Sequence, residues 1–201
     1  MIKAEKELYL PTRHYFEKQG FSVDGEVKNC DLVAIKNDIV VVAELKKTFN
    51  ISLVYQLMER KNITPYVYAV IFRPKNFRDK KTKQMLKLVK LLGVGLLVVS
   101  DASGIIEEIV APNNDISNIK VNTKKRNMVS KEFNKREFRE NTGGVNRKKI
   151  LTAYRENSIA ALCVANTYSV VETRKVKDKI KKAVQSNYYD NFSYFYGYGF
   201  G

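Results

Sequence analysis

The sequence has few residues of the kinds that build disulfide frameworks, zinc sites and membrane spans. It contains 2 cysteines and 1 histidine in 201 residues. Cys30 and Cys163 lie far apart and lack metal-ligand spacing, so we expect two small buried residues instead of a disulfide or a zinc site. The longest apolar runs, such as IVVVA and LLGVGLLVV, are too short to cross a bilayer, and the N-terminal segment is too acidic for a signal peptide. We therefore expect a cytoplasmic protein with no membrane partner.

Two common catalytic arrangements are also missing from the sequence. The single histidine, His14, falls in the first predicted helix, where a structural or surface role is favoured over that of a general base. No pattern suggests a nucleophilic triad. The run GVGLL lacks the lysine and the helix start that a phosphate-binding loop needs.

Acidic residues are scarce relative to basic ones. The chain has 36 Lys and Arg against 21 Asp and Glu, a net charge of +15. Residues 1–110 hold 18 basic and 13 acidic residues, whereas residues 111–201 hold 18 and 8. This excess favours a polyanionic partner, nucleic acid ahead of an anionic membrane surface, although a composition rich in Lys, Asn and Ile can also follow from the base composition of a genome.

Hydrophobic periodicity predicts an α-β-β-β-α-β-α-β order followed by a polar stretch and a helical segment. We predict three parts: a first domain at 1–111, a basic polar linker at 112–147 and a small C-terminal domain at 148–201. Within the first domain three helices are predicted, at 51–62, at 79–92 and at 4–20, the last broken or kinked near Pro11. The predicted strands are 21–27, 31–36, 39–47, 66–72 and 94–100.

The run EVKNCDLVAIKNDIVVVAELK, residues 26–46, ends an apolar strand with two charged side chains. If Asn37 and Asp38 form a two-residue hairpin turn, Asp31 lies directly opposite Glu44, and Lys46 shares their face of the sheet. Two carboxylates this close would repel each other unless a divalent cation lay between them. The alternative is a solvent-exposed cluster at frayed strand ends, and a longer turn would separate the faces.

Asp31 followed by Glu44-Leu45-Lys46 on the second and third strands resembles the PD-(D/E)XK nuclease superfamily, the fold of many restriction enzymes. Three runs resemble more closely the DUF2161 type of PD-(D/E)XK phosphodiesterase. They are EKELYLPTRHYFEKQGFSVDGEVKNCDLVA, VVAELKKTFNISLVYQLMER and, later, TGGVNRKKILTAYRE, so that the resemblance covers most of residues 5–72 and resumes around 142–156. It implies an α/β, restriction-endonuclease-like core with a mixed central sheet. Cys30 stands where the superfamily motif has proline.

The resemblance assigns roles to individual residues of the core. Asp31 and Glu44 would bind the metal, and Lys46 would orient the attacking water or offset transition-state charge. An acid on the first helix, Glu5 or less favourably Glu7, would complete the metal shell, with Glu26 a further candidate. Alternatively, Glu5 and Glu7 are ordinary acids of a first helical turn. Gln56 and Arg60 lie four residues apart on the next helix and therefore on one face of it. Gln56 would support the site. Arg60 would bind phosphate or, alternatively, pair with Glu59 or contact solvent.

For the C-terminal part the resemblance implies a winged helix. Phosphate contacts there would come from five closely spaced lysines: Lys175, Lys177, Lys179, Lys181 and Lys182. Alternatively, these lysines form the solvated side of a helix. The chain ends in a Tyr- and Phe-rich tail that lacks Lys and Arg, unlike the aromatic and basic wing usual in the family. This tail either stacks on bases or packs on its own domain.

The resemblance thus implies a metal-dependent phosphodiesterase that cleaves nucleic acid, DNA ahead of RNA, with Mg²⁺ or Mn²⁺ as cofactor. The alternative is a non-catalytic nucleic-acid-binding or regulatory protein with a vestigial nuclease site. The intact set of Asp31, Glu44 and Lys46 favours hydrolysis. The oligomeric state, including a homodimer, stays open.

Overall fold

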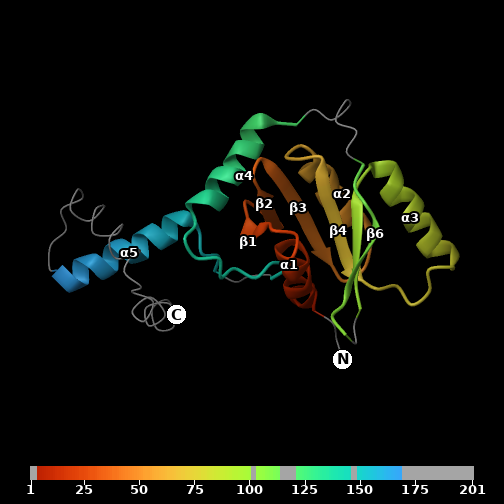
Figure 1. Ribbon diagram of the computed structural model, residues 1–201, viewed down its shortest axis with the longest axis horizontal. Coiled ribbons are helices and arrows are strands. Elements are labelled where there is room, and N and C mark those ends of the chain that lie inside the picture. Colours follow the sequence, from red (N-terminus) through yellow and green to blue (C-terminus); the bar gives the residue numbers. More distant parts are fainter. Residues whose placement is uncertain (1–3, 101–102, 114–120, 146–148, 169–201) are drawn as a thin grey trace. The chain divides into compact units, whose positions relative to one another are not determined.

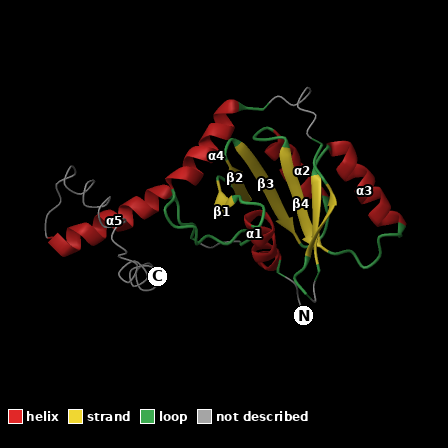
Figure 2. Cartoon of the chain, in the orientation of Figure 1, coloured by secondary structure: helices red, strands yellow, loops and turns green. Residues whose placement is uncertain are grey.

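A mixed six-stranded sheet forms the centre of the protein (Figures 1 and 2). The structure is a computed structural model that describes residues 4–100, 103–113, 121–145 and 149–168. The strands lie in chain order, and only β3–β4 and β4–β5 are parallel pairs. They are β1 (Ser22–Val27), β2 (Cys30–Lys36), β3 (Ile39–Lys46), β4 (Tyr66–Phe72), β5 (Gly95–Val99) and β6 (Ile106–Val110).

Helices occur before, within and after the sheet in sequence. A 3₁₀ turn, η1, leads directly into the first α-helix, and Pro11 stands in the first turn of that helix, where its missing N–H costs no hydrogen bond. The break therefore precedes Pro11. The helices are η1 (Glu5–Leu8), α1 (Tyr9–Glu17), α2 (Ile51–Lys61), α3 (Lys80–Leu92), α4 (Thr123–Lys135) and α5 (Ala153–Tyr168).

The register predicted for the β2–β3 hairpin is confirmed. Lys36 pairs with Ile39, and the ladder continues to Leu32 opposite Ala43. Asn37 occupies the turn with a φ of 52°, a left-handed conformation that Asn tolerates better than most residues. The next facing positions toward the open end of the hairpin are Asp31 and Glu44.

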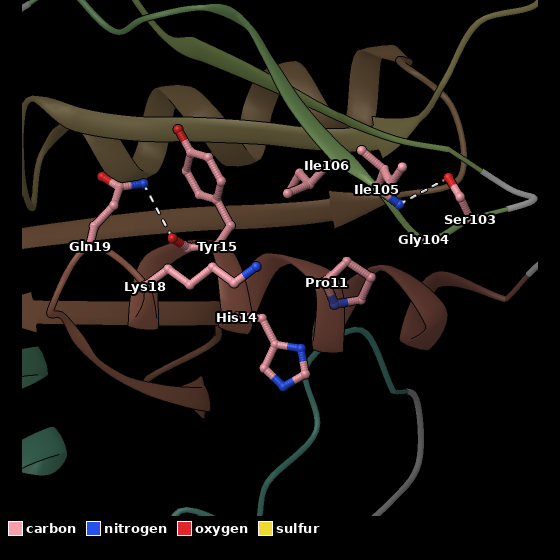
Figure 3. A pocket seen from close by; sticks show the side chains of 9 residues that line it. All are labelled: Pro11, His14, Tyr15, Lys18, Gln19, Ser103, Gly104, Ile105 and Ile106. Carbon is pink, nitrogen blue, oxygen red and sulfur yellow. Dashed lines mark hydrogen bonds between the residues drawn. The ribbon is translucent and has the colours of Figure 1, made fainter.

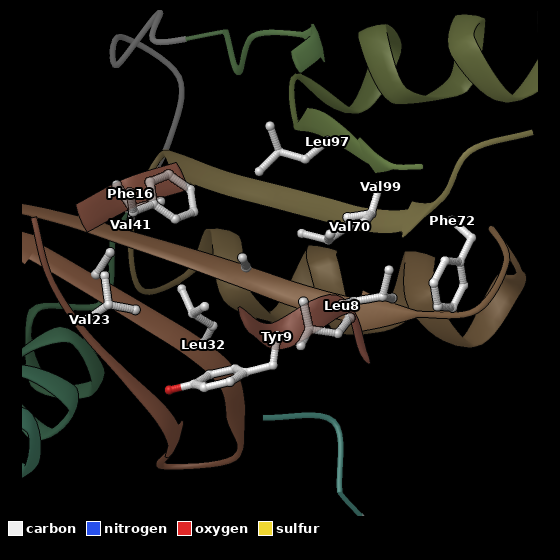
Figure 4. Close-up of a cluster of buried hydrophobic side chains, with 13 residues drawn as sticks. Leu8, Tyr9, Phe16, Val23, Leu32, Val41, Val70, Phe72, Leu97 and Val99 are labelled. Atoms are coloured by element: carbon white, nitrogen blue, oxygen red, sulfur yellow. The ribbon is translucent and has the colours of Figure 1, made fainter. Parts of the chain in front are cut away.

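Alternation along the strands divides the core between two faces of the sheet. On one face, Leu8, Tyr9 and Phe16 from η1 and α1 pack on side chains such as Leu32 and Leu45 (Figure 4). On the opposite face, α2 and α3 cover β4 and β5. Because Asp31 and Glu44 alternate with Leu32 and Leu45, the candidate carboxylates belong to the face that α2 covers.

The sheet has a strand that the predicted order lacks. Strand β6 pairs antiparallel with β5, with a bulge at Leu96 and Leu97. Its sequence, IEEIV, carries two consecutive glutamates, both exposed, and so lacks an apolar alternation. Charged side chains suit an edge strand, and the carboxylate of Glu108 accepts hydrogen bonds from the Tyr15 and Tyr68 hydroxyls at 2.8 and 3.0 Å.

The predicted linker at 112–147 also differs from the structure. It contains α4, and two residues of this polar helix, Val129 and Phe133, are buried with Val33, Val40 and other residues of the sheet. Two apolar side chains four residues apart are a weak signal in a helix so rich in charge, because the exposed residues outnumber them. Part of the predicted linker is therefore core structure.

We expect replacement of Phe133 by alanine to lower the free energy of unfolding by about 3–5 kcal/mol, because this ring is 1% exposed and its removal leaves a cavity. The matched control is Met128→Ala on the same helix, at a residue that is 48% exposed, which should change stability by less than about 0.5 kcal/mol. Urea unfolding of both variants measures the difference. Equal effects would show that α4 contributes no packing to the core.

The chain divides into two compact units, residues 1–135 with 139–150 and residues 136–138 with 151–201. Within the second unit, the buried carboxylate of Glu156 on α5 accepts hydrogen bonds from the backbone N–H groups of Glu137 and Phe138 at 2.8 and 3.2 Å. The predicted winged helix, its lysines and the aromatic tail fall largely on residues 169–201, outside the described residues.

Two further sequence expectations concern membranes and cysteines. Among the described residues, no helix is long and apolar enough to span a bilayer. Both cysteines are free thiols. Cys30 is buried as expected, whereas Cys163 on α5 is only half-buried.

Candidate active site

Asp31 and Glu44 lie at the open end of the β2–β3 hairpin. The paired ladder ends at Leu32 opposite Ala43, and Asp31 and Glu44 are the next residues of the two strands, with carboxyls close enough to shift each other's pKa. The backbone N–H of Leu45 donates a hydrogen bond to Asp31 Oδ2 at 2.8 Å. This bond fixes the Asp31 carboxylate against the strand that carries Glu44, so that the hairpin itself positions both acids.

Glu44 is fully buried, with 0% exposure. Its Oε1 accepts a hydrogen bond from Arg60 Nε at 2.6 Å, while its Oε2 has no hydrogen-bond partner among the described residues. A buried carboxylate oxygen without a partner costs free energy, so its retention needs an explanation. A cation ligand would supply one, and so would a proton shared with the Asp31 carboxyl, which lies within hydrogen-bonding reach of Glu44.

Burial, and then the negative charge of Asp31, raise the pKa of Glu44 to about 8, although Arg60 acts in the opposite direction. The pKa of Asp31 is also raised by burial, despite the Leu45 N–H bond and the nearby Lys46 charge. Both carboxyls therefore hold protons more tightly than usual. Raised pKa values of this kind are typical of buried, closely placed carboxyls, and such groups occur often at functional sites.

Lys46 lies at the end of β3 and does not bond to Glu44. Its Nζ pairs with Glu5 Oε2 at 3.3 Å, and both side chains are about one-fifth exposed, at 22% and 21%. The contact connects the strand that carries Glu44 to η1. The predicted first-helix acid is thus brought to the predicted lysine, while Glu7 is exposed and its Oε1 accepts from the Ala4 N–H.

Helix α2 carries Gln56 and Arg60 four residues apart, and Arg60 reaches Glu44 on the covered face of the sheet. Gln56 Oε1 is buried and has no hydrogen-bond partner among the described residues. Arg60 is 9% exposed and donates from Nη2 to the Asn29 carbonyl oxygen at 2.6 Å, as well as to Glu44 and Glu59. A phosphate-binding role for Arg60 stays a prediction, and in this structure its guanidinium is hydrogen-bonded to Glu44.

The sequence carries a signal for this buried arginine. Leu53, Leu57 and Arg60 have the spacing of one helix face, and the two leucines are completely buried. An arginine that continues an apolar stripe toward the core needs a carboxylate partner there. The pattern could therefore have identified Arg60 as an internal partner of Glu44.

The family model described as "Putative PD-(D/E)XK phosphodiesterase (DUF2161)" matches residues 96–196, just over half of the chain. The chain belongs to this family. No curated protein and no solved structure matches it. The matched range includes the run at 142–156 but not residues 5–72, which carry Asp31 and Glu44. The mixed six-stranded α/β fold agrees with membership, and the DUF2161 description indicates phosphodiesterase activity.

The donor set at the hairpin fits a hard divalent cation in part. Two carboxylates converge there, and Mg²⁺ is commonly held by one or two carboxylates with water and substrate oxygens as the remaining ligands. No group of three His, Cys, Asp or Glu side chains placed to hold a metal occurs in the part of the chain that the structure describes. Glu5 is directed to Lys46, and Glu26 Oε1 accepts from the Gly144 N–H at 3.1 Å, so neither completes a carboxylate triad as placed.

A separate cavity of about 500 Å³ lies between α1 and the turn that precedes β6 (Figure 3). Its lining includes His14, Lys18, Ser103 and Ile105, and none of the residues predicted for the active site. His14 is exposed there. The position is consistent with the surface role expected for this histidine and gives it no contact with Asp31 or Glu44.

Proposed function

We propose that this DUF2161 member is a divalent-metal-dependent nuclease that hydrolyses phosphodiester bonds, preferring DNA to RNA. The observation that carries the proposal is the convergence of two buried carboxyls, Asp31 and Glu44, with a Glu44 Oε2 that no hydrogen-bond donor of the described residues reaches. Asp31 and Glu44 would hold Mg²⁺ or Mn²⁺. When bound, such an ion supplies Lewis-acid polarisation of the phosphate and a more acidic attacking water.

The remaining site residues have separate tasks in this proposal. Lys46 would place its ammonium beside the scissile phosphate and stabilise the charge that develops there. Glu5 holds Lys46 Nζ at 3.3 Å in the free protein and would either release it to substrate or add an oxygen ligand. The buried Gln56 Oε1 would accept a hydrogen bond from a water molecule near the two acids.

Arg60 would fix the geometry of Glu44. Its Nε–H occupies Oε1 at 2.6 Å and leaves Oε2 available to a ligand. Because its Nη2 is anchored on the Asn29 carbonyl oxygen at 2.6 Å, the guanidinium cannot follow a substrate without breaking that bond. The proposal therefore assigns Arg60 to support of the carboxylate, and substrate binding to other basic residues.

Those residues are proposed to lie in the C-terminal part. Residues 111–201 combine 18 basic with 8 acidic residues, an excess that favours contact with phosphates. We assign non-specific DNA affinity to this part, including the lysines between 175 and 182, and catalysis to the sheet. The proposed organisation is a nuclease domain that extends beyond residue 111 to include α4, followed by a winged-helix domain within 148–201.

The experiment that tests the proposal is incubation of supercoiled, linear, branched and single-stranded DNA, and of RNA, with Mg²⁺ or Mn²⁺. Wild-type protein is expected to cleave at least one DNA substrate, and Asp31→Asn to lose cleavage by at least about 10²-fold, because an amide cannot replace a charged ligand. Asp38→Asn, at the exposed turn of the same hairpin, is the control and should cleave normally. Cleavage by Asp31→Asn at the wild-type rate would contradict the proposal.

One observation favours a second candidate, a DNA-binding protein without catalysis. The Arg60 guanidinium already supplies a positive charge to Glu44, which is what a vestigial metal site would need to stay folded. In that case calorimetry would detect no divalent ion binding, and DNA affinity would be the same with EDTA as with Mg²⁺.

A further inference from the structure

Residues 139–145, here called the strap, pack closely against the elements that carry the candidate acids. The strap follows α4 in sequence and contacts α1, where Arg13 Nη1 donates to the Arg139 carbonyl oxygen at 3.2 Å. Figure 4 shows a teal segment of chain beside Tyr9, and Gly143 lies next to that ring. The strap lies within the range matched by the DUF2161 model, whereas Asp31 and Glu44 do not.

Gly143 lies against the backbone of Asp31. A Cβ atom added at Gly143 would lie 2.1 Å from the Asp31 carbonyl oxygen and 2.9 Å from its carbonyl carbon. Both are backbone atoms of β2, which cannot move aside as a flexible side chain can. Any residue with a side chain at 143 must therefore displace either the strap or the end of β2.

Two further glycines allow the same close approach. A Cβ atom at Gly25 on β1 would lie 2.5 Å from the Asn141 carbonyl oxygen, so the strap also touches β1. A Cβ atom at Gly144 would lie 3.2 Å from the carbonyl carbon of Glu5. In addition, the Gly144 N–H donates to Glu26 Oε1 at 3.1 Å. The strap thus touches Asp31 and Glu5, two of the three acids predicted to bind metal.

We propose that the strap is a positioning device for the active site, in which Gly143 sets the place of the Asp31 backbone and Gly144 that of Glu5. The inference rests on the proposed nuclease function. On one side, the Leu45 N–H holds the Asp31 carboxylate on β3 by a hydrogen bond. On the other side, the close packing of Gly143 limits how far the backbone of Asp31 can move. Asp31 can then face Glu44 without a rearrangement at the moment of metal binding.

The test compares Gly143→Ala, Gly144→Ala and the control Gly104→Ala. Gly144 and Gly104 both have a left-handed φ, 71° and 63°, so alanine introduces similar backbone strain at each. An added Cβ at Gly104 meets nothing within 4 Å, whereas one at Gly144 meets Glu5. The difference between these two variants therefore isolates the contact with Glu5.

We expect Gly143→Ala to lower kcat by about 10²-fold with little change in KM, since a misplacement of about 1 Å at a catalytic group has an effect of that size. Its affinity for Mn²⁺, measured by calorimetry without DNA, should fall about tenfold or more. Gly144→Ala should lose about tenfold in kcat, and Gly104→Ala should match wild type in both measurements.

Wild-type protein is measured first. If it neither binds Mn²⁺ nor cleaves DNA, the proposed function fails and the inference fails with it. If wild type is active, the inference alone is overturned when a folded Gly143→Ala keeps wild-type kcat and Mn²⁺ affinity. Should Gly143→Ala not fold, Gly144→Ala decides: a loss beyond that of Gly104→Ala supports the strap, and equality with Gly104→Ala overturns it.

Discussion

Replacement of Lys46 by alanine is expected to lower the rate of DNA cleavage by roughly 10²–10³ while leaving most of the DNA affinity intact. Loss of one group that stabilises transition-state charge typically costs about 3–4 kcal/mol in activation free energy. Affinity, in contrast, is spread over many basic residues among the 36 in the chain. The two measurements should therefore separate by at least one order of magnitude.

Lys47→Ala is the matched control, because Lys47 is the exposed neighbour of Lys46 and has the same charge. Lys47→Ala should lower the DNA affinity and the cleavage rate by the same small factor. Urea unfolding of both variants checks protein stability separately, since Lys46→Ala removes an ion pair with Glu5 whose side chains are only 22% and 21% exposed. Single-turnover cleavage and equilibrium binding at one fixed salt concentration provide the two values. Parallel losses in both would assign Lys46 to binding alone.

The hairpin shows which parts of this protein local sequence rules can predict. Its register follows from a two-residue turn at Asn37 and Asp38 and from strand alternation, and both operate over a few residues. The opposition of Asp31 and Glu44 therefore needed no knowledge of the rest of the chain. The same rules predicted α2 and α3, whose apolar faces have helical spacing.

Tertiary contacts explain what the sequence rules missed. Strand β6 is defined by its pairing with β5, since two adjacent glutamates break any apolar alternation. Helix α4 is anchored by only two fully buried apolar residues. The strap depends on close approaches of backbone to backbone at Gly25 and Gly143, which a sequence shows only as glycines in a polar stretch. Propensity carries no information about partners more than 100 residues away.

The partner of Glu44 illustrates how such contacts change the interpretation of a site. Glu44 and Lys46 lie two residues apart on β3, yet the structure pairs Lys46 with Glu5 and Glu44 with Arg60. Alternation explains the proximity of Glu44 and Lys46 on one face, but the choice of partner depends on α2 and η1. The effect of substituting Glu44 therefore depends on Arg60.

Replacement of Glu44 by glutamine is expected to stabilise the metal-free protein increasingly as pH rises from 5 to 8. The pKa of Glu44 is raised from 4.5 to about 8 in the folded protein. A carboxyl with a raised folded-state pKa binds its proton more tightly when folded, so stability is lost as pH rises from the unfolded pKa toward the folded one. Glutamine does not ionise and should not show this loss.

The size of the effect follows from the pKa difference. Each pKa unit corresponds to about 1.4 kcal/mol, so the upper limit across the window is roughly 5 kcal/mol. The glutamine amide oxygen can still accept the Arg60 Nε–H, which keeps the guanidinium partnered. Glu59→Gln is the matched control, because Glu59 also pairs with Arg60 but its side chain is 70% exposed. This variant should follow the wild-type pH dependence.

Urea unfolding at several pH values in EDTA measures the effect, and repetition with Mg²⁺ tests the metal site. A ligand that binds the folded state stabilises it by mass action. Wild type should therefore gain stability from Mg²⁺ at pH 8, where Glu44 is ionised about half the time. The gain should be smaller at pH 6, because the protonated carboxyl binds the ion poorly. Glu44→Gln should gain nothing at either pH. A Glu44→Gln protein that is several kcal/mol less stable than wild type at every pH would instead identify the Glu44–Arg60 pair as a structural element, and would favour the non-catalytic candidate.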